Sequence, residues 1–230
     1  MKFMRKLHRW LGLLVGLQVV LWIASGFGMS LLDAREVAGE GQVAFESDMA
    51  MLSTDLQYLE PAAMLAMLPE GGAVQSMELK RELGFWVWRV QGPAGVKLYD
   101  ARSGAIMKVD ETRARWLAQN EYFGDGSIGA VTLMEEPTLE ARDHPLPLWR
   151  VDFNDARHTR YYIGIDEGRI LERRNDTWAL FDIFWMLHTM DYAGRDDFNT
   201  PWVIAFACGA SWLAISGMLL LLKSFRVIRD

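Results

Sequence analysis

Two long apolar stretches lie near the two ends of the chain, and the region between them is rich in charged residues. Residues 10–32 form 23 consecutive positions without a charged side chain, and residues 198–222 form 25 more. A bilayer hydrocarbon core of ~30 Å needs about 20 apolar residues of α-helix to cross it. The pattern therefore predicts two transmembrane helices, within residues 1–32 and 198–230, and makes the lipid bilayer the first expected partner.

Basic residues flank each apolar stretch on the side of the nearer chain end. Such residues stay on the cytoplasmic side of a membrane. We therefore expect both termini in the cytoplasm, the helices in a bacterial inner membrane, and the central region in the periplasm. The flanking residues are Lys2, Arg5, Lys6 and Arg9 before the first stretch, and Lys223, Arg226 and Arg229 after the second.

The charge balance fits this orientation, because the chain has a net charge of −6 and its basic residues gather at the ends. Without the seven flanking basic residues and Asp230, 17 basic and 29 acidic residues remain, a net charge of −12. An acidic central region argues against nucleic acid as a partner.

Two alternatives to this membrane interpretation carry less weight. The small residues Ala24-Ser25-Gly26 could end a cleaved signal peptide, but the first apolar stretch is longer than the usual ~7–15 residues of such a segment. The second stretch is too long for a buried core helix. Cys208, the only cysteine, lies within that second stretch, so it cannot form an intrachain disulfide and is expected to act as a small packing residue.

Between the apolar stretches, residues 33–175 show the pattern of one α+β domain. Residues 33–42 are polar and contain glycine, as a linker would. Pro61 and the Gly71-Gly72 pair bound a short helix at 60–68. Aromatic and β-branched residues interrupted by glycine turns predict strands at 85–90, 96–100 and 105–109, followed by a second helix at 111–121.

A weak internal repeat organises this region. The triplet Trp88-Arg89-Val90 recurs as Trp149-Arg150-Val151, and the strand–turn–strand segment 98–107 recurs as 162–171. Gly104 and Gly168 stand at the corresponding turns. The sequence therefore predicts two repeats, each a helix plus an antiparallel hairpin, packed as one domain with a mainly antiparallel sheet.

Residues 176–197 form a different segment just before the second apolar stretch. Large apolar side chains recur there at three- and four-residue spacing, which predicts an amphipathic helix over 176–190 followed by a loop. Tryptophan favours the headgroup level, so this helix is expected at the membrane interface. The residues concerned are Trp178, Phe181, Phe184, Trp185, Leu187, His188 and Met190.

Three segments resemble the PepSY-associated transmembrane proteins of bacteria, in a short form with two helices. They are LHRWLGLLVGLQVVLWIASG at 7–26, WRVDF with RHTRYYIGIDEGRILERRND within 149–176, and the stretch from LHTMDY to ISGMLLLL at 187–222. Residues 33–60 and 120–145 match nothing in that family.

The resemblance implies a redox function. Relatives include four-helix membrane reductases that carry haem b between histidines and pass electrons to periplasmic flavins or ferric siderophores. This chain has two predicted helices instead of four. We expect an iron-containing, haem b electron-transfer subunit, in which the haem supplies the chemistry. The alternative is a non-catalytic, membrane-anchored PepSY module that binds a periplasmic protein or peptide, with segment 85–90 accepting a peptide strand at a sheet edge.

Two histidines are candidate ligands of the haem iron. His8 precedes the first apolar stretch, and Gly12 and Gly16 follow it at helical spacing, leaving room for a flat porphyrin. The same glycine spacing also serves plain helix packing. His188 lies on the aromatic face of the segment 176–190, where an axial ligand is plausible, although it could equally cap that helix or contact lipid headgroups.

The predicted membrane positions put His8 and His188 on the order of 30 Å apart, at opposite edges of the bilayer. One haem in one chain cannot use both. If both are ligands, either a homodimer pairs each histidine with its symmetry mate, or a membrane redox partner subunit supplies the missing ligands.

The remaining motifs indicate no enzyme built from the chain's own side chains. His144 and His158 have no second His or Cys at metal-ligand spacing, and both are expected at the surface. Residues 124–129 fit Gly-x-Gly-x-x-Gly literally, but no βαβ unit surrounds them.

Overall fold

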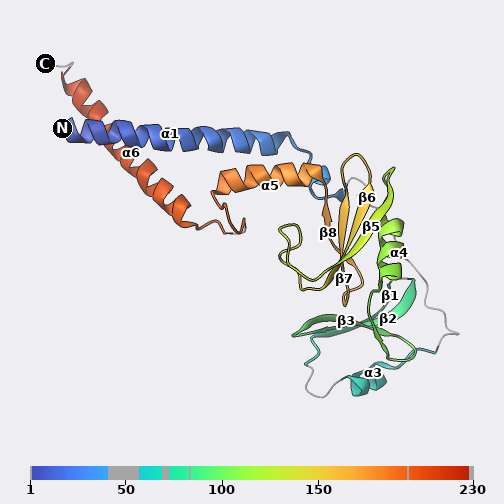
Figure 1. Ribbon diagram of the computed structural model, residues 1–230. Helices are drawn as coiled ribbons and strands as arrows, with labels where there is room; N and C mark the ends of the chain where they lie inside the picture. The colour runs from blue at the N-terminus through green and yellow to red at the C-terminus, as the bar shows by residue number, and fades with distance from the viewer. Residues whose placement is uncertain (1, 41–56, 69–72, 83, 196, 228–230) are drawn as a thin grey trace. The chain divides into compact units, whose positions relative to one another are not determined.

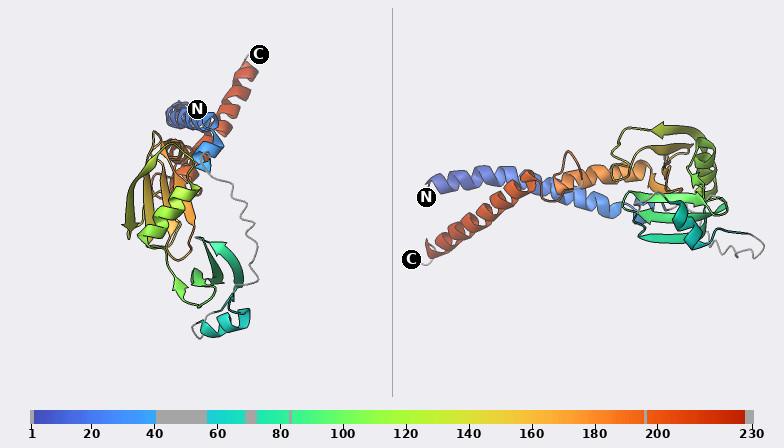
Figure 2. Two further views of the ribbon diagram at one scale, coloured as in Figure 1. Left: turned by 90° about the vertical axis from the view of Figure 1, so that its right-hand side faces the viewer. Right: turned by 90° about the horizontal axis from the view of Figure 1, so that it is seen from below.

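The computed structural model describes residues 2–40, 57–68, 73–82, 84–195 and 197–227. The chain forms two compact units. A helical unit comprises Met1–Val37 and Thr177–Asp230, and an α+β unit comprises Ala38–Asp176. The expected α+β class, with long apolar helices at both ends and antiparallel sheets between them, is confirmed (Figures 1 and 2).

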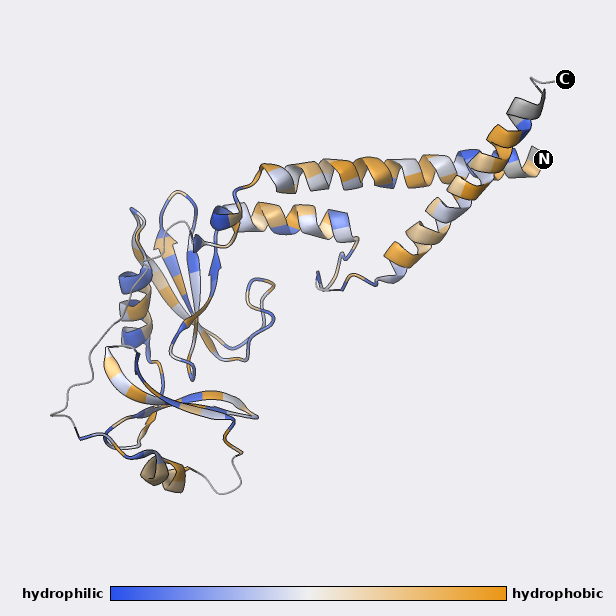
Figure 3. Cartoon of the chain, turned by 180° about the vertical axis from the view of Figure 1, so that it is seen from behind, coloured by the Kyte–Doolittle hydropathy of each residue, from blue (hydrophilic) through white to orange (hydrophobic). Residues whose placement is uncertain are grey.

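Two helices of the helical unit are long and apolar enough to cross a membrane. They are α1 (Lys2–Leu31) and α6 (Pro201–Val227), and the qualifying segments within them are Arg5–Leu31 and Pro201–Lys223. Apolar residues cover most of both helices in Figure 3, and few of their side chains are buried. Helix α6 begins at Pro201, three residues after the start of the uncharged run at residue 198. The hydroxyl of Thr200 accepts a hydrogen bond from the Val203 amide at 3.3 Å and caps the N-terminus of α6.

Helix α6 runs antiparallel to α1. The Trp22 and Phe206 rings meet at a centroid distance of 5.9 Å. This pair lies at one end of the contact between α1 and α6. The hydrogen bond between His8 and Ser216 lies at the other end. Helix α5 (Asp176–Thr189), predicted from its aromatic spacing, lies along α1 (Figure 1). A Cβ on Gly28 would lie only 2.6 Å from the Phe184 ring, so glycine permits this close approach.

The α+β unit contains two antiparallel four-stranded sheets instead of the single sheet that we predicted. Their strand orders are β1-β2-β3-β4 and β5-β6-β7-β8, so each sheet is a simple meander. Hairpin connections between consecutive strands explain this order. The bounds are Ser76–Glu82, Phe85–Gly92, Gly95–Asp100 and Ile106–Met107 for the first sheet, and Ser127–Met134, Leu148–Asn154, Arg160–Gly164 and Ile170–Arg174 for the second.

A helix precedes each sheet, as the repeat suggested. Helix α3 (Pro61–Met67) comes before the first sheet and α4 (Glu111–Glu121) before the second. The predicted turn glycines, Gly104 and Gly168, have φ angles of +69° and +67°, a conformation that favours glycine. One short segment differs from prediction, because residues 34–37 of the expected linker form helix α2 (Ala34–Val37). The last two linker positions, 41–42, lie outside the described residues.

One continuous core joins both sheets to α4. Alternation along β2 sends Val87 into this core and the neighbouring Trp88 to the opposite face, against α3. The indole of Trp149 donates a hydrogen bond to the Val109 carbonyl at 2.8 Å, which ties the second sheet to the end of the first. The shared core consists of Val87, Leu98, Val109, Ala114, Leu117, Ala118, Tyr122, Val151, Phe153, Tyr161, Ile163 and Ile170.

Segment 85–90 cannot accept a peptide strand in the way that the alternative function required. It belongs to β2, which pairs with β1 along Ser76–Glu82 and with β3 along Gly95–Asp100. Both rows of its backbone hydrogen-bonding groups are therefore used within the sheet. The expectation of edge pairing at this strand was wrong, because the charged residues of β1 do not resemble a strand in the sequence.

The carboxylate of Asp155 stabilises the turn between β6 and β7 through hydrogen bonds. It accepts bonds from the Thr159 amide at 2.7 Å, the Thr159 hydroxyl at 2.5 Å and the Tyr122 hydroxyl at 3.0 Å. Burial raises the pKa of Asp155, but the bonds from Thr159 and Tyr122 outweigh burial and leave the pKa below its usual 3.8. The ionised carboxylate therefore stabilises the folded state at neutral pH.

We expect Asp155→Asn to lower the free energy of unfolding by about 2 kcal/mol at pH 7, as hydrogen bonds to a charged group are lost. Because the folded-state pKa is depressed, this stabilisation is lost as the pH falls through it, so the difference from wild type should shrink below pH 3.8. Thermal melts from pH 7 to pH 3 measure both quantities. If the variant and the wild type differed in free energy of unfolding by the same amount at pH 7 and at pH 3, this role of Asp155 would be contradicted.

Candidate functional site

The imidazole of His8 lies against the C-terminal half of α6, at Ser216 and Gly217. Its Nδ1 atom is 2.6 Å from the Ser216 hydroxyl oxygen. The same hydroxyl lies 3.2 Å from the Leu213 carbonyl, to which it can donate its hydrogen. Ser216 therefore holds the Nδ1 side of the His8 imidazole, and Nε2 lies on the other side of the ring.

His188 has a matching environment in the last turn of α5. Its Nδ1 atom lies 3.2 Å from the Trp22 carbonyl and 3.3 Å from the Ser25 hydroxyl. A carbonyl only accepts, and Ser25 donates its hydrogen to the same Trp22 carbonyl at 3.0 Å. Nδ1 of His188 therefore donates toward these two oxygens, and Nε2 lies on the other side of the ring.

Trp22 fixes His188 from two sides. Its indole N–H donates to the His188 carbonyl at 2.5 Å, and the two rings lie 5.2 Å apart at an interplanar angle of 31°. The backbone and the ring of His188 are thus both held by α1. Only the Nε2 edge of this imidazole remains free to bind another group.

Neither Nε2 atom has a hydrogen-bond partner among the described residues. Histidines that bind a metal commonly donate a hydrogen bond from one ring nitrogen and bind the metal through the other. Hydrogen bonds at Nδ1 orient the ring and raise the basicity of Nε2. His8 and His188 both have this arrangement, so each fits an axial ligand of haem iron.

The same dipeptide supports both histidines. Ser216-Gly217 of α6 holds His8, and Ser25-Gly26 of α1 holds His188. A Cβ on Gly217 would lie 3.3 Å from Cε1 of His8, and one on Gly26 would lie 3.2 Å from Cε1 of His188. Serine orients each ring, and glycine leaves it room. These four residues were not among the predicted site residues, although a Ser-Gly pair in each apolar stretch was a visible signal.

The two predicted glycines of α1 have different surroundings. A Cβ on Gly12 would lie 3.9 Å from the Leu213 side chain, an ordinary contact with α6. A Cβ on Gly16 would meet nothing within 4 Å. Gly12 therefore takes part in packing between the two helices, whereas the space beside Gly16 is open to a ligand or to a second chain.

The two histidines occupy different levels along α1. His8 belongs to this helix, and His188 contacts it at Trp22 and at Gly26. At ~1.5 Å per residue, these levels are about 25 Å apart. The two imidazoles therefore cannot bind opposite faces of one haem in one chain.

An apolar groove of about 360 Å³ opens between α1 and α6, at levels between the two histidines. Gln18 is its polar contribution from α1, and the Nε2 atom of Gln18 is buried without a hydrogen-bond partner among the described residues. The groove is lined by Leu11, Leu14, Val15, Gln18, Met190, Tyr192, Trp202, Ala205, Phe206 and Gly209.

The other two histidines bind carboxylates of the α+β unit. Nε2 of His144 lies 2.8 Å from Glu172, and Nδ1 of His158 lies 2.7 Å from Asp176. His158 is exposed as expected, whereas His144 is partly buried. Within the part of the chain that the structure describes, no group of three or more His, Cys, Asp or Glu side chains could hold a metal ion.

Asp191, which precedes α6, has a structural role. It is buried and accepts hydrogen bonds from the amides of Ala193, Gly194 and Asp197 at 3.0–3.2 Å. A second acidic residue, Asp182, pairs with Arg195. These carboxylates order the loop between α5 and α6.

The chain matches no model of a known protein family, no curated protein and no solved structure.

Proposed function

We propose that this chain is a two-helix PepSY-type protein of the bacterial inner membrane that carries haem b and passes electrons to a periplasmic flavin or ferric acceptor. The observation that carries the proposal is the shared state of His8 and His188, in which Nδ1 is held by the protein and Nε2 is free. Two imidazoles that are each oriented through Nδ1 and offer Nε2 to a further group support a bound iron centre.

The chain's own residues would position and shield such a group. Ser216 and Ser25 would orient the two imidazoles through Nδ1 and leave Nε2 to bind iron. Trp22 packs against His188 and limits the access of water to it. When bound, haem b would supply one-electron chemistry, which none of these side chains can supply.

A homodimer is the assembly that best completes this site. Each histidine is one ligand, and the two levels are too far apart to serve one haem, so the second axial ligand comes from outside the chain. In a two-fold dimer, His8 would face its mate at the cytoplasmic level and His188 its mate at the periplasmic level. The open space beside Gly16 supports close approach of a second copy. A membrane redox partner could supply the same ligands in a heteromer.

Electron transfer can be tested directly on the purified full chain. Protein from haem-sufficient cells would be placed in lipid nanodiscs, reduced with dithionite, freed of excess reductant, and mixed anaerobically with FMN or a ferric chelate. We expect the reduced haem spectrum to disappear on mixing, at a rate that rises with acceptor concentration. A stable reduced spectrum with both acceptors would contradict the proposed function while leaving haem binding intact.

A further inference from the structure

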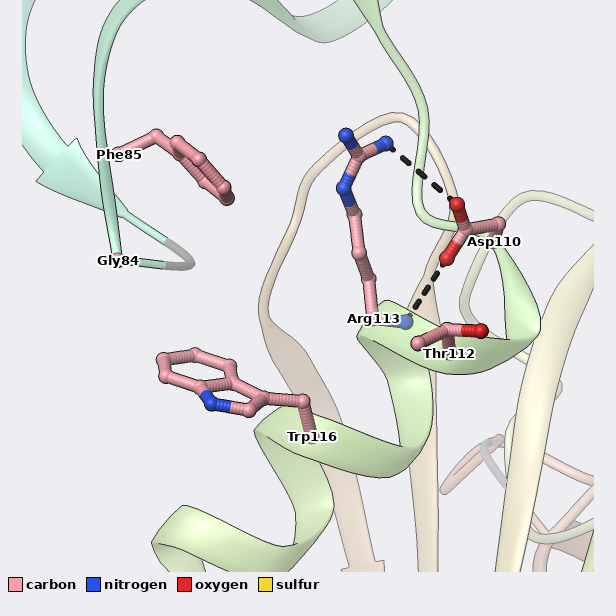
Figure 4. A pocket seen from close by; sticks show the side chains of 6 residues that line it. All are labelled: Gly84, Phe85, Asp110, Thr112, Arg113 and Trp116. Atoms are coloured by element: carbon pink, nitrogen blue, oxygen red, sulfur yellow. Dashed lines mark hydrogen bonds and ion pairs between the residues drawn. The ribbon is translucent and has the colours of Figure 1, made fainter.

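An open groove of about 440 Å³ lies in the α+β unit, between the turn that joins β1 to β2 and the exposed side of α4 (Figure 4). No part of the proposed haem function uses it. Phe85 lines it from the start of β2, and Trp116 lines it from α4. Both side chains are about half exposed, at 52% and 47%. Two large, half-exposed aromatic side chains that line the same groove make it a candidate binding surface.

The local backbone holds the two rings apart. Gly84 has a φ angle of +77°, and a Cβ there would lie 3.7 Å from the Trp116 indole. Gly84 therefore lies close to one edge of the indole, while the Phe85 ring lies on the other side of the groove (Figure 4). The faces of both rings are available for stacking against a flat group.

Arg113 adds a positive charge beside the rings. Its Nη1 atom donates to the Lys108 carbonyl at 2.9 Å and lies 3.7 Å from the Asp110 carboxylate. Asp110 also accepts from the Arg113 amide at 2.8 Å and caps α4. Figure 4 shows the other two guanidinium nitrogens on the side that faces Phe85 and the groove. Two parallel N–H groups of this kind match the two oxygens of a carboxylate.

We propose that this groove binds a small, water-soluble, fused-ring aromatic carboxylate, with its rings between Phe85 and Trp116 and its carboxylate on Arg113. The volume favours a small molecule over a single aromatic side chain of a partner protein, because it falls in the range of small-molecule pockets. The inference rests on this groove alone and does not depend on haem.

The probe for the test is 6-fluoro-2-naphthoate, which has two fused rings and a carboxylate. It would be titrated onto the full chain in lipid nanodiscs, and binding would be followed by broadening of its ¹⁹F signal, with empty nanodiscs as the blank. The neutral 6-fluoro-2-naphthamide would be titrated in parallel. We expect saturable broadening of the naphthoate, and binding of the amide that is about 10-fold weaker.

Variants separate the roles of the three side chains. Phe85→Ala and Trp116→Ala should each weaken naphthoate binding about 10-fold, whereas Trp116→Phe, which keeps a ring for stacking, should stay within about 3-fold of wild type. Arg113→Gln should weaken binding of the naphthoate and leave that of the amide unchanged. Phe123→Ala and Arg115→Gln, at exposed positions outside the groove, are the matched controls and should bind as wild type.

Because all these positions are at the surface, thermal melting should show that each variant is folded. Absence of saturable broadening with wild type, or equal weakening in the Phe123→Ala and Arg115→Gln controls, would overturn the proposal. The first result would leave Phe85 and Trp116 as contact residues for a partner protein.

Discussion

Purified His8→Ala and His188→Ala proteins are each expected to retain about half of the haem b of wild type, and the double variant none. Each imidazole offers a free Nε2 atom at its own level of the helical unit, so loss of one should empty one level and spare the other. Haem per chain, measured by pyridine haemochrome absorbance against protein concentration, gives the result.

The matched control for these variants is His158→Ala. His158 is an exposed imidazole paired with Asp176, and its removal should leave the haem content unchanged. Wild-type haem content in either His8→Ala or His188→Ala would show that the altered histidine is not a ligand. Complete loss of haem in a single variant would show that the two levels do not load independently.

The second large effect is expected from Gly16→Leu. A Cβ at this position would meet nothing within 4 Å in the single chain, so contacts between α1 and α6 should remain intact. The leucine side chain would occupy the space that a porphyrin or a second copy needs. We expect haem per chain and the dimer fraction to fall several-fold, while the helix content by circular dichroism stays at the wild-type value.

The dimer fraction would be measured by native mass spectrometry from detergent. Leu21→Phe enlarges an exposed position of α1 about 140° round the helix from Gly16 and serves as the control, with no expected change in haem or assembly. If Gly16→Leu kept wild-type haem content and assembly, the open surface beside this glycine would have no part in the site.

Prediction from the sequence succeeded where one physical signal was strong and local. Long runs without charge predicted α1 and α6, and the spacing of aromatic residues predicted α5, because apolar periodicity is set by the helix itself. The turns at Gly104 and Gly168 were found because a left-handed backbone favours glycine.

Prediction from the sequence failed for the first strand of each sheet, β1 and β5. Strand β1 (Ser76–Glu82) is rich in charged residues, and five of its seven positions are lysine, arginine, glutamate or serine, so it lacks the usual strand composition. Strand β5 (Ser127–Met134) begins inside the glycine-rich segment 124–129, which reads as a loop. Tertiary pairing with β2 and β6 creates these strands, and a local pattern does not reveal it.

The two candidate histidines could be singled out from the sequence, whereas the residues that contact them could not. His8 and His188 stand out in the sequence because histidine is rare near apolar helices. Ser25 and Ser216 do not, since serine is ordinary in membrane helices, and only the fold brings each serine to a histidine more than 160 positions away.

The most direct test of the account is the reduced-minus-oxidised visible spectrum of the wild-type full chain, purified in detergent from cells supplied with a haem precursor. The account predicts a sharp b-type band and about one haem per chain, which corresponds to two haems per dimer. A folded, colourless protein from such cells would contradict this account, because Nε2 of His8 and of His188 would then not bind haem iron.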